Sequence, residues 1–129
     1  MKKILIISAF LGMFAVILGA FGAHGLRGYI PDASLESYKT GVQYQFIHVL
    51  AIVGIFSIYS RYPLPLFKTV GWLFLIGIIL FSGSLYLLTT SSMWTSSSVS
   101  FLGPITPLGG LFFIAGWLVF IIGLTKIKA

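Results

Sequence analysis

Four long apolar runs divide the chain, with short polar segments between them. The runs cover residues 4–23, 41–60, 69–88 and 105–124, and none contains a charged side chain. A helix needs about 20 mostly apolar residues to cross the hydrocarbon core of a bilayer, and each run has this length. Segments of about ten residues with alternating polarity, typical of transmembrane strands, do not occur. The pattern therefore predicts an all-α membrane protein with four transmembrane helices in an antiparallel bundle.

The polar segments predict how the helices connect. Before the second run, Asp32 has the character of a helix N-cap, and no helix breaker follows it. The second helix is therefore expected to start in the membrane interface, over about 33–40. The next link is short and contains Pro63 and Pro65, which favours adjacent antiparallel helices. No linker or change in composition marks a second domain, so residues 1–129 are expected to form one.

Composition agrees with a membrane protein. Hydrophobic residues make up 58% of the chain and charged residues 8%, which is too few to cover a soluble domain of this length. The net charge of +6 would suit nucleic acid, but the basic residues flank the apolar runs, so no nucleic-acid partner is expected. The absence of cysteine excludes disulfides, thiolate nucleophiles and cysteine-bound metals.

Basic residues predict the direction of the spans. With four spans, the two termini and the link between the second and third runs lie on one side of the membrane. That side holds six of the eight basic residues, namely Lys2, Lys3, Arg61, Lys68, Lys126 and Lys128. The other side has Arg27 and Lys39, offset by Asp32 and Glu36. The positive-inside rule therefore places both termini in the cytoplasm and the protein in the cell membrane.

A secretory signal peptide is the alternative for the first run. Two lysines precede it, and Ala20 and Gly22 would suit a small-residue cleavage site. The run is longer than the usual core of a signal peptide, which favours a permanent span. Cleavage would leave three spans in the same direction, so the charge pattern keeps this alternative open.

Small residues recur on one face of two of the predicted helices. In the first they are Ser8, Gly12, Ala15, Gly19 and Gly22, which fall within about 80° of arc at 100° per residue. In the last they are Gly109, Gly116 and Gly123. Because lipid gives no hydrophobic drive between helices, such faces predict close helix packing. Packing within one chain is favoured over packing between subunits.

Polar side chains inside the runs gather, given this topology, at the outer end of the bundle. Such side chains are costly in lipid and usually face protein or water. The predicted cluster comprises His24, Tyr44, Gln45, His48, Ser82, Ser84, Tyr86 and Thr106. Since the stripe that carries Gln45 and His48 continues inward with Ile52 and Ile55, the cluster is expected to be shallow.

Two alternative roles are considered for this cluster, helix packing and ligand binding. In the packing role, His24 caps the first helix, and Gln45 and His48 form hydrogen bonds between helices. Ser82 and Ser84 are then expected to bond to the backbone of their own helix or to permit close packing. In the binding role, His24, Gln45 and His48 would hold a small ligand, a lipid or a proton.

No set of residues points to catalysis or to metal binding. Two histidines without a nearby thiolate or carboxylate are a thin basis for a metal or haem site. The two carboxylates, Asp32 and Glu36, lie four residues apart outside the runs and suit capping and interfacial charge. We therefore expect a protein that is not an enzyme, with no catalytic residue, metal or cofactor.

Four stretches, GAFGAHGL, YQFIH, LFSGSLY and ITPLGG, occur in this order along the chain. With them the sequence resembles the small bacterial membrane proteins grouped as domain of unknown function 423, which are similar to animal transmembrane protein 256. The matching positions are 19–26, 44–45, 48, 81–86 and 105–110, and the resemblance extends over nearly the whole chain. It implies a multi-pass protein of the cell membrane with no established activity.

Two functions follow as hypotheses. The first is a non-enzymatic structural or partner-binding protein of the lipid bilayer, with a homo-oligomer or another membrane protein as its partner. The second is a small-ligand, lipid or proton-linked binding or transport protein that uses the outer polar cluster. The substitution His48→Ala separates them, because it should lower stability in the first case and release a bound species in the second.

Overall fold

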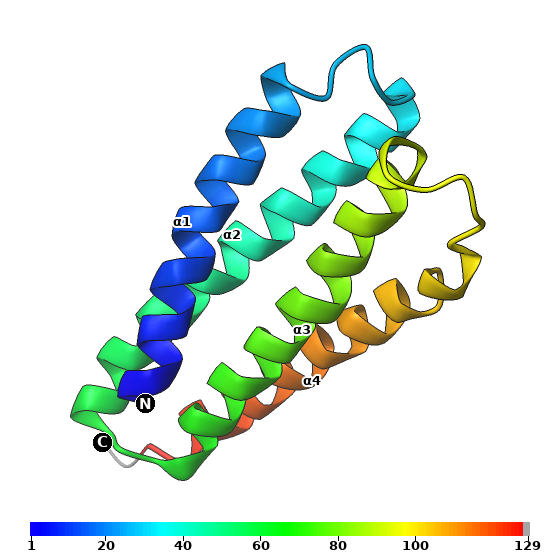
Figure 1. Cartoon of the computed structure of the whole chain (residues 1–129). Coiled ribbons are helices and arrows are strands. Elements are labelled where there is room, and N and C mark those ends of the chain that lie inside the picture. The colour runs from blue at the N-terminus through cyan, green and yellow to red at the C-terminus, as the bar shows by residue number, and fades with distance from the viewer. Residues whose placement is uncertain (128–129) are drawn as a thin grey trace.

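Four α-helices make up most of the protein in the computed structural model, which describes residues 1–127 (Figure 1). The elements are α1 (Lys2–His24), α2 (Asp32–Arg61), α3 (Pro65–Thr90), the 3₁₀ turns η1 (Ser91–Met93) and η2 (Ser100–Leu102), and α4 (Ile105–Thr125). All four α-helices are long and apolar enough to cross a membrane, and each contains one of the apolar runs. The predicted all-α membrane fold is confirmed.

Proline lies at the start of α2 and α3, and Pro104 takes the N-cap position of α4. α3 begins at Pro65, where the fixed φ suits the first turn and the missing N–H is not needed. Before α2, Pro31 takes the N-cap position and Asp32 is the first helical residue, so the prediction that Asp32 is the N-cap is wrong by one residue. The Asp32 carboxylate makes no capping hydrogen bond and acts through its charge at the positive end of the helix. From there α2 runs unbroken to Arg61.

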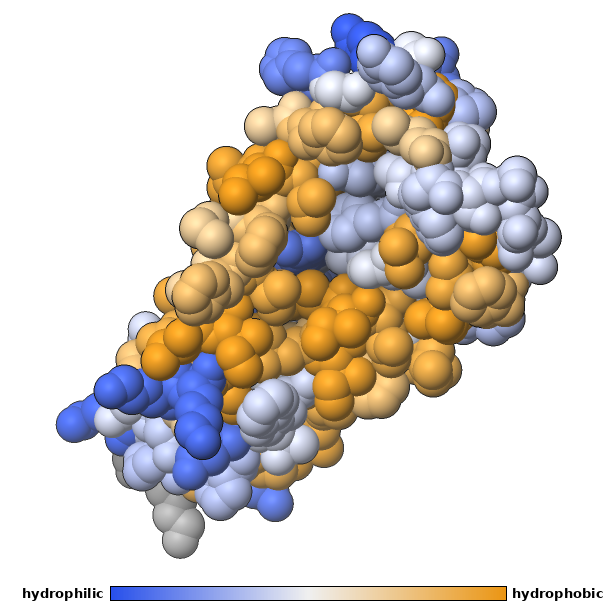
Figure 2. Space-filling model, viewed as in Figure 1, coloured by the Kyte–Doolittle hydropathy of each residue, from blue (hydrophilic) through white to orange (hydrophobic). Residues whose placement is uncertain are grey.

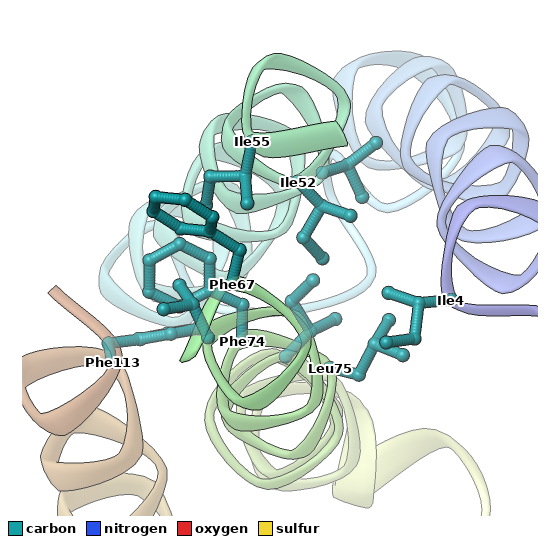
Figure 3. Packing of buried hydrophobic residues seen from close by; sticks show 10 residues of the cluster. Ile4, Ile52, Ile55, Phe67, Phe74, Leu75 and Phe113 are labelled. Atoms are coloured by element: carbon teal, nitrogen blue, oxygen red, sulfur yellow. The ribbon is translucent and has the colours of Figure 1, made fainter. Parts of the chain in front are cut away.

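The helices α2 and α3 form the centre of the bundle. Along its length α3 packs against both α2 and α4, whereas α1 packs mainly on α2. A view down the helices shows α1 and α4 on opposite sides of the central pair (Figure 3). The surface is apolar around the middle of the molecule and hydrophilic at its two ends (Figure 2). This distribution matches a bundle that spans a bilayer.

A buried apolar cluster fills the space between the central helices. Ile52, Phe67 and Phe74 have no exposed surface, and Ile4 of α1 and Phe113 of α4 complete the cluster from the two sides (Figure 3). Since the surrounding lipid is as apolar as these side chains, dispersion contacts rather than the hydrophobic effect hold the helices together.

Small residues on α1 face α2. Ser8 and Ala15 are buried, and a Cβ atom built on Gly12 would lie 3.2 Å from Cγ1 of Val49. The two remaining glycines of the series also face α2, Gly19 towards Val42 and Gly22 towards the ring of Tyr38.

The glycines of α4 lie even closer to α3. A Cβ atom on Gly109 would be 2.7 Å from Cα of Phe81, which is backbone and has no room to yield. Those on Gly116 and Gly123 would meet the rings of Phe74 and Phe67 at 2.6 and 2.8 Å. Both series of small residues therefore pack within one chain, with the backbones of α3 and α4 in close approach.

Candidate functional site

A ladder of hydrogen bonds follows the buried side of α2. Four residues at helical spacing, Tyr38, Gly41, Gln45 and His48, are buried along this helix. Each forms a hydrogen bond through its side chain or carbonyl to one of the other three helices. We call these four residues and their bonding partners the polar ladder. It connects all four helices.

The outer two rungs join α2 to α1 and to α3. The hydroxyl of Tyr38 donates to the carbonyl of Leu18 at 2.8 Å, and the hydroxyl of Ser82 donates to the carbonyl of Gly41 at 2.6 Å. A Cβ atom at Gly41 would lie 3.1 Å from Cε1 of Tyr86, so the glycine permits this approach. The hydroxyl of Ser82 does not bond to its own helix but points across to α2, and the alternative expectation, that this serine permits close packing, agrees with its full burial.

Gln45 forms the third rung and joins three helices. Its Nε2 donates to the carbonyl of Leu11 at 2.7 Å, and its Oε1 accepts from the hydroxyl of Tyr86 at 2.8 Å. These two bonds fix which end of the amide points to α1 and which to α3. Each end of an amide has capacity for two hydrogen bonds, so one N–H and one lone pair are left over.

His48 forms the innermost rung and joins α2 to α4. Its Nδ1 lies 2.8 Å from the carbonyl of Tyr44, and its Nε2 accepts from the indole N–H of Trp117 at 3.2 Å. Because a carbonyl only accepts, Nδ1 carries the proton, and because an indole only donates, Nε2 offers its lone pair. The geometry therefore assigns the neutral Nδ1–H tautomer, with both ring nitrogens engaged.

Aromatic rings enclose the His48 imidazole. The ring of Phe113 stacks on it with centroids 3.6 Å apart and planes 9° from parallel, and Phe74 meets it edge-on at 4.9 Å. Side chains such as His48, Phe113 and Trp117 bridge α2 and α4, whose backbones do not come into close contact along the described residues. A proton added to Nε2 of His48 would point at the N–H of Trp117 among these aromatic rings, and it would take the place of the hydrogen bond between the two side chains.

A separate polar contact joins α3 to α4. The hydroxyls of Ser84 and Thr106 lie 2.6 Å apart, and Ser84 also lies 3.0 Å from the carbonyl of Phe81 in its own helix. The own-helix bond predicted for Ser84 is present, together with a bond between helices. Tyr44 takes part in the ladder through its carbonyl, while its ring is 40% exposed and packs on Phe81 at 4.6 Å.

The ladder extends deeper than the shallow cluster predicted from the sequence. Trp117 lies twelve residues after Ile105, or about 18 Å along α4 at 1.5 Å per residue, which is past the middle of the helix. Its partner His48 is close to the middle of α2. The ladder therefore runs from the end of the bundle where α2 begins to the middle of the spans.

His24 does not join this ladder. Its side chain is exposed at the end of α1, and it makes no hydrogen bond to a described residue. The backbone N–H groups of Gly25 and Leu26 cap α1 by donating to the carbonyl of Phe21. The expected capping of α1 by the His24 side chain is not found among the described residues.

Trp117 is the residue that sequence reasoning missed. It lies in a run that is otherwise apolar, and its indole N–H needs an acceptor when it is inside a membrane. This need for an acceptor is the signal in the sequence that could have identified Trp117. The choice of His48 as the acceptor depends on the register between α2 and α4, which periodicity along one helix does not contain.

A cleft opens towards lipid between α1 and α3. It has a volume of about 260 Å³, and α2 contributes its floor. Its lining residues are Leu11, Phe14, Leu18, Gln45, Ile78, Ile79, Gly83 and Tyr86. Figure 2 shows this hollow, with hydrophilic residues inside it. The polar ladder therefore borders this cleft, with the buried Gln45 at its floor and Tyr86 in its wall.

Hydrogen bonds account for the buried polar side chains of the described part of the chain. Within residues 1–127, every buried side-chain nitrogen and oxygen has a hydrogen-bond partner. No three histidine, aspartate or glutamate side chains in that range lie together as a metal site would need. Glu36 pairs with Lys39 at 2.7 Å on an exposed turn of α2, remote from His48 along the helix.

Comparison with known proteins places this architecture among other membrane proteins. A family model described as "Protein of unknown function (DUF423)" matches residues 18–110. The UPF0382 membrane protein YwdK of Bacillus subtilis is 42% identical over 127 residues, which cover 98% of each chain. The UPF0382 inner membrane protein YgdD of Escherichia coli is 35% identical over 127 residues, covering 98% of this chain and 92% of its own. No solved structure matches the chain.

Proposed function

Because the chain belongs to the DUF423 family of unknown function, we propose a role from its own geometry, that of a non-enzymatic membrane protein. In this proposal the polar ladder holds the four helices in one arrangement. The outer faces of the bundle then meet the bilayer and a partner, which is a second copy of the chain or another membrane protein.

The state of His48 carries this proposal. A general base or a metal ligand needs a free nitrogen lone pair, and the Nε2 lone pair of His48 is taken by Trp117. Its other nitrogen is bonded to the Tyr44 carbonyl, and aromatic rings lie against one face and an edge of the imidazole. An imidazole held in this way stabilises the contact between α2 and α4.

The substitution Trp117→Phe tests this role. It keeps an aromatic ring but removes the N–H that His48 accepts, so the free energy of unfolding should fall by about 0.6 kcal/mol and at most about 1.7. Trp72→Phe is the matched control, because Trp72 is similarly exposed, at 49% against 40% for Trp117, but its indole makes no hydrogen bond to a described residue. Thermal unfolding of the purified protein in detergent, followed by circular dichroism, measures both variants. Equal loss in the two variants would contradict the proposal.

A second measurement separates the structural role from ligand binding at His48. Native mass spectrometry compares the wild-type protein with His48→Ala. We expect a lower unfolding temperature and no change in bound species. A species released by His48→Ala without loss of stability would refute the structural role.

The cleft between α1 and α3 favours a second candidate function. Its walls are apolar, and Gln45 brings an amide with a remaining N–H and lone pair to its floor. We propose that this cleft takes a molecule dissolved in the membrane, with an apolar body and one carbonyl or hydroxyl group. The carbonyl or hydroxyl oxygen of this molecule would accept a hydrogen bond from the remaining N–H of Gln45.

Filling the cleft tests this candidate without touching the ladder. A Cβ atom on Gly83 would meet no atom within 4 Å, so Gly83→Leu should occupy the space while Gln45 keeps its bonds. Gly54→Leu is the matched control, because Gly54 is equally open but lines a different groove, between α2 and α4. Native mass spectrometry should then show a lipid-phase species lost from Gly83→Leu alone. Retention in both variants, or loss from both, would contradict the candidate.

The cell membrane is the proposed location, with both termini in the cytoplasm. The names of the relatives give "membrane" and "inner membrane", and the six basic residues on one side support the direction. Because the chain has no cysteine, single cysteines report topology cleanly. A cysteine at the exposed Ser97 should react with an impermeant reagent from outside the cell, and one at the exposed Tyr62 should not. The reverse result would overturn the direction.

A further inference from the structure

Positive charge gathers at one end of the bundle without acidic side chains. Lys2 begins α1, Arg61 ends α2, Lys68 lies in the first turn of α3 and Lys126 follows α4. The antiparallel order brings these positions to the end where α1 begins, α4 ends and the link between α2 and α3 lies (Figure 1). The only two acidic side chains, Asp32 and Glu36, are in the first turns of α2, at the opposite end.

A pocket lies within this basic end. It has a volume of about 380 Å³ and is lined by Arg61, Tyr62, Pro63, Leu64, Lys126 and Ile127. Two of these residues, Arg61 and Lys126, are cations that come from the ends of different helices. The pocket therefore places two positive side chains around one hollow at the boundary of the apolar band.

The pocket lining is partly charged and partly apolar, as is a phospholipid near the membrane surface. The guanidinium of Arg61 offers paired N–H donors that match phosphate oxygens, and Lys126 adds a second positive charge. Pro63, Leu64 and Ile127 give the same hollow an apolar wall. A free phosphate ion would use only the charged part of this lining, whereas an anionic phospholipid would use both.

We propose that this pocket, formed by the α2–α3 link and the end of α4, binds the phosphate headgroup of an anionic phospholipid. Basic pockets between transmembrane helices on the cytoplasmic side attract anionic headgroups in this way. The headgroup then connects the end of α2 to the end of α4, which make no close backbone contact with each other.

A different reading of the same charges makes a different prediction. Cations at the C-terminal ends of helices offset the helix dipole, and both Arg61 and Lys126 are in such positions. If that were their only role, the protein would show no preference among phospholipids.

Native mass spectrometry of the full chain tests the proposal with phosphatidylglycerol and phosphatidylcholine as probes. The wild-type protein should retain phosphatidylglycerol in preference to phosphatidylcholine. The double variant Arg61→Gln with Lys126→Gln should bind phosphatidylglycerol about an order of magnitude more weakly. The matched control is Lys2→Gln with Lys3→Gln, which removes the same charge from the same end but does not alter the lining of the pocket. This control should keep most of the preference.

Several outcomes would overturn the proposal. Equal loss in the two double variants would assign the preference to the general charge of this end, and no preference in the wild type would leave only the dipole role. Equal protection against thermal unfolding by inorganic phosphate would exclude the phospholipid as the specific ligand. If the pocket variant does not fold, added potassium chloride replaces it, because screening should weaken phosphatidylglycerol retention by the wild type. Retention that does not change with salt would count against the pocket.

Discussion

Two neighbouring glycines of α4 leave different amounts of space for an added methyl group. A Cβ atom on Gly109 would lie 2.7 Å from Cα and 2.8 Å from Cβ of Phe81. A Cβ atom on Gly110 would have nothing nearer than Cδ2 of the same Phe81, at 4.0 Å. The pair Gly109→Ala and Gly110→Ala therefore changes the same chemistry in the same helix and differs only in what the methyl group meets.

The expected energies follow from these distances. Alanine gains about 1 kcal/mol over glycine in a helix interior, and both variants receive this gain. Carbon atoms in good contact are about 3.5–4.0 Å apart, so Gly109→Ala forces α4 away from α3 by roughly 1 Å. Overpacking of this kind costs about 1–3 kcal/mol, and the cost tends to the upper end here because backbone blocks the methyl group. We expect Gly109→Ala to be about 2–3 kcal/mol less stable than Gly110→Ala.

Unfolding in detergent measures this difference. Both variants and the wild type would be titrated with a denaturing detergent, and helix content followed by circular dichroism. Gly110→Ala should match or exceed the wild type, and Gly109→Ala should unfold first. Equal stability of the two variants would show that α3 and α4 do not approach as closely as described, and the packing argument would fail.

Two further substitutions test single rungs of the polar ladder. Tyr38→Phe removes the donor to the Leu18 carbonyl and should lower the free energy of unfolding by about 0.6 kcal/mol, whereas Tyr29→Phe, at a side chain 73% exposed, should leave the unfolding temperature unchanged. Ser82→Ala removes the donor to Gly41 and should have an effect of similar size in the same thermal assay, at most about 1.7 kcal/mol. A larger loss for Ser82→Ala would mean that the hydroxyl does more than bond to that carbonyl.

The sequence predicts the helices and the buried side of α2 well, because both depend on periodicity along a single helix. The spacing of Gln45 and His48 predicts a shared face, and both residues are buried on it. The partners depend on how helices sit against each other, which one helix does not encode. This is why Trp117 was missed, and why Ser82 was expected to bond within its own helix. His24 was assigned to the cluster by position alone, and the backbone of the following turn caps α1 without it.

The polar ladder has a consequence for how the protein is made. Helices enter the membrane in order along the chain, so the α1–α2 hairpin arrives before α3 and α4. At that stage Gln45 can already donate to the Leu11 carbonyl, but the donors from the second hairpin, the Tyr86 hydroxyl and the Trp117 indole N–H, are still to come. The half-inserted protein then holds an amide oxygen and an imidazole nitrogen without donors in the bilayer, where such groups are costly. Arrival of the second hairpin satisfies both atoms, so the same bonds that fix the finished bundle also draw its two halves together during biogenesis.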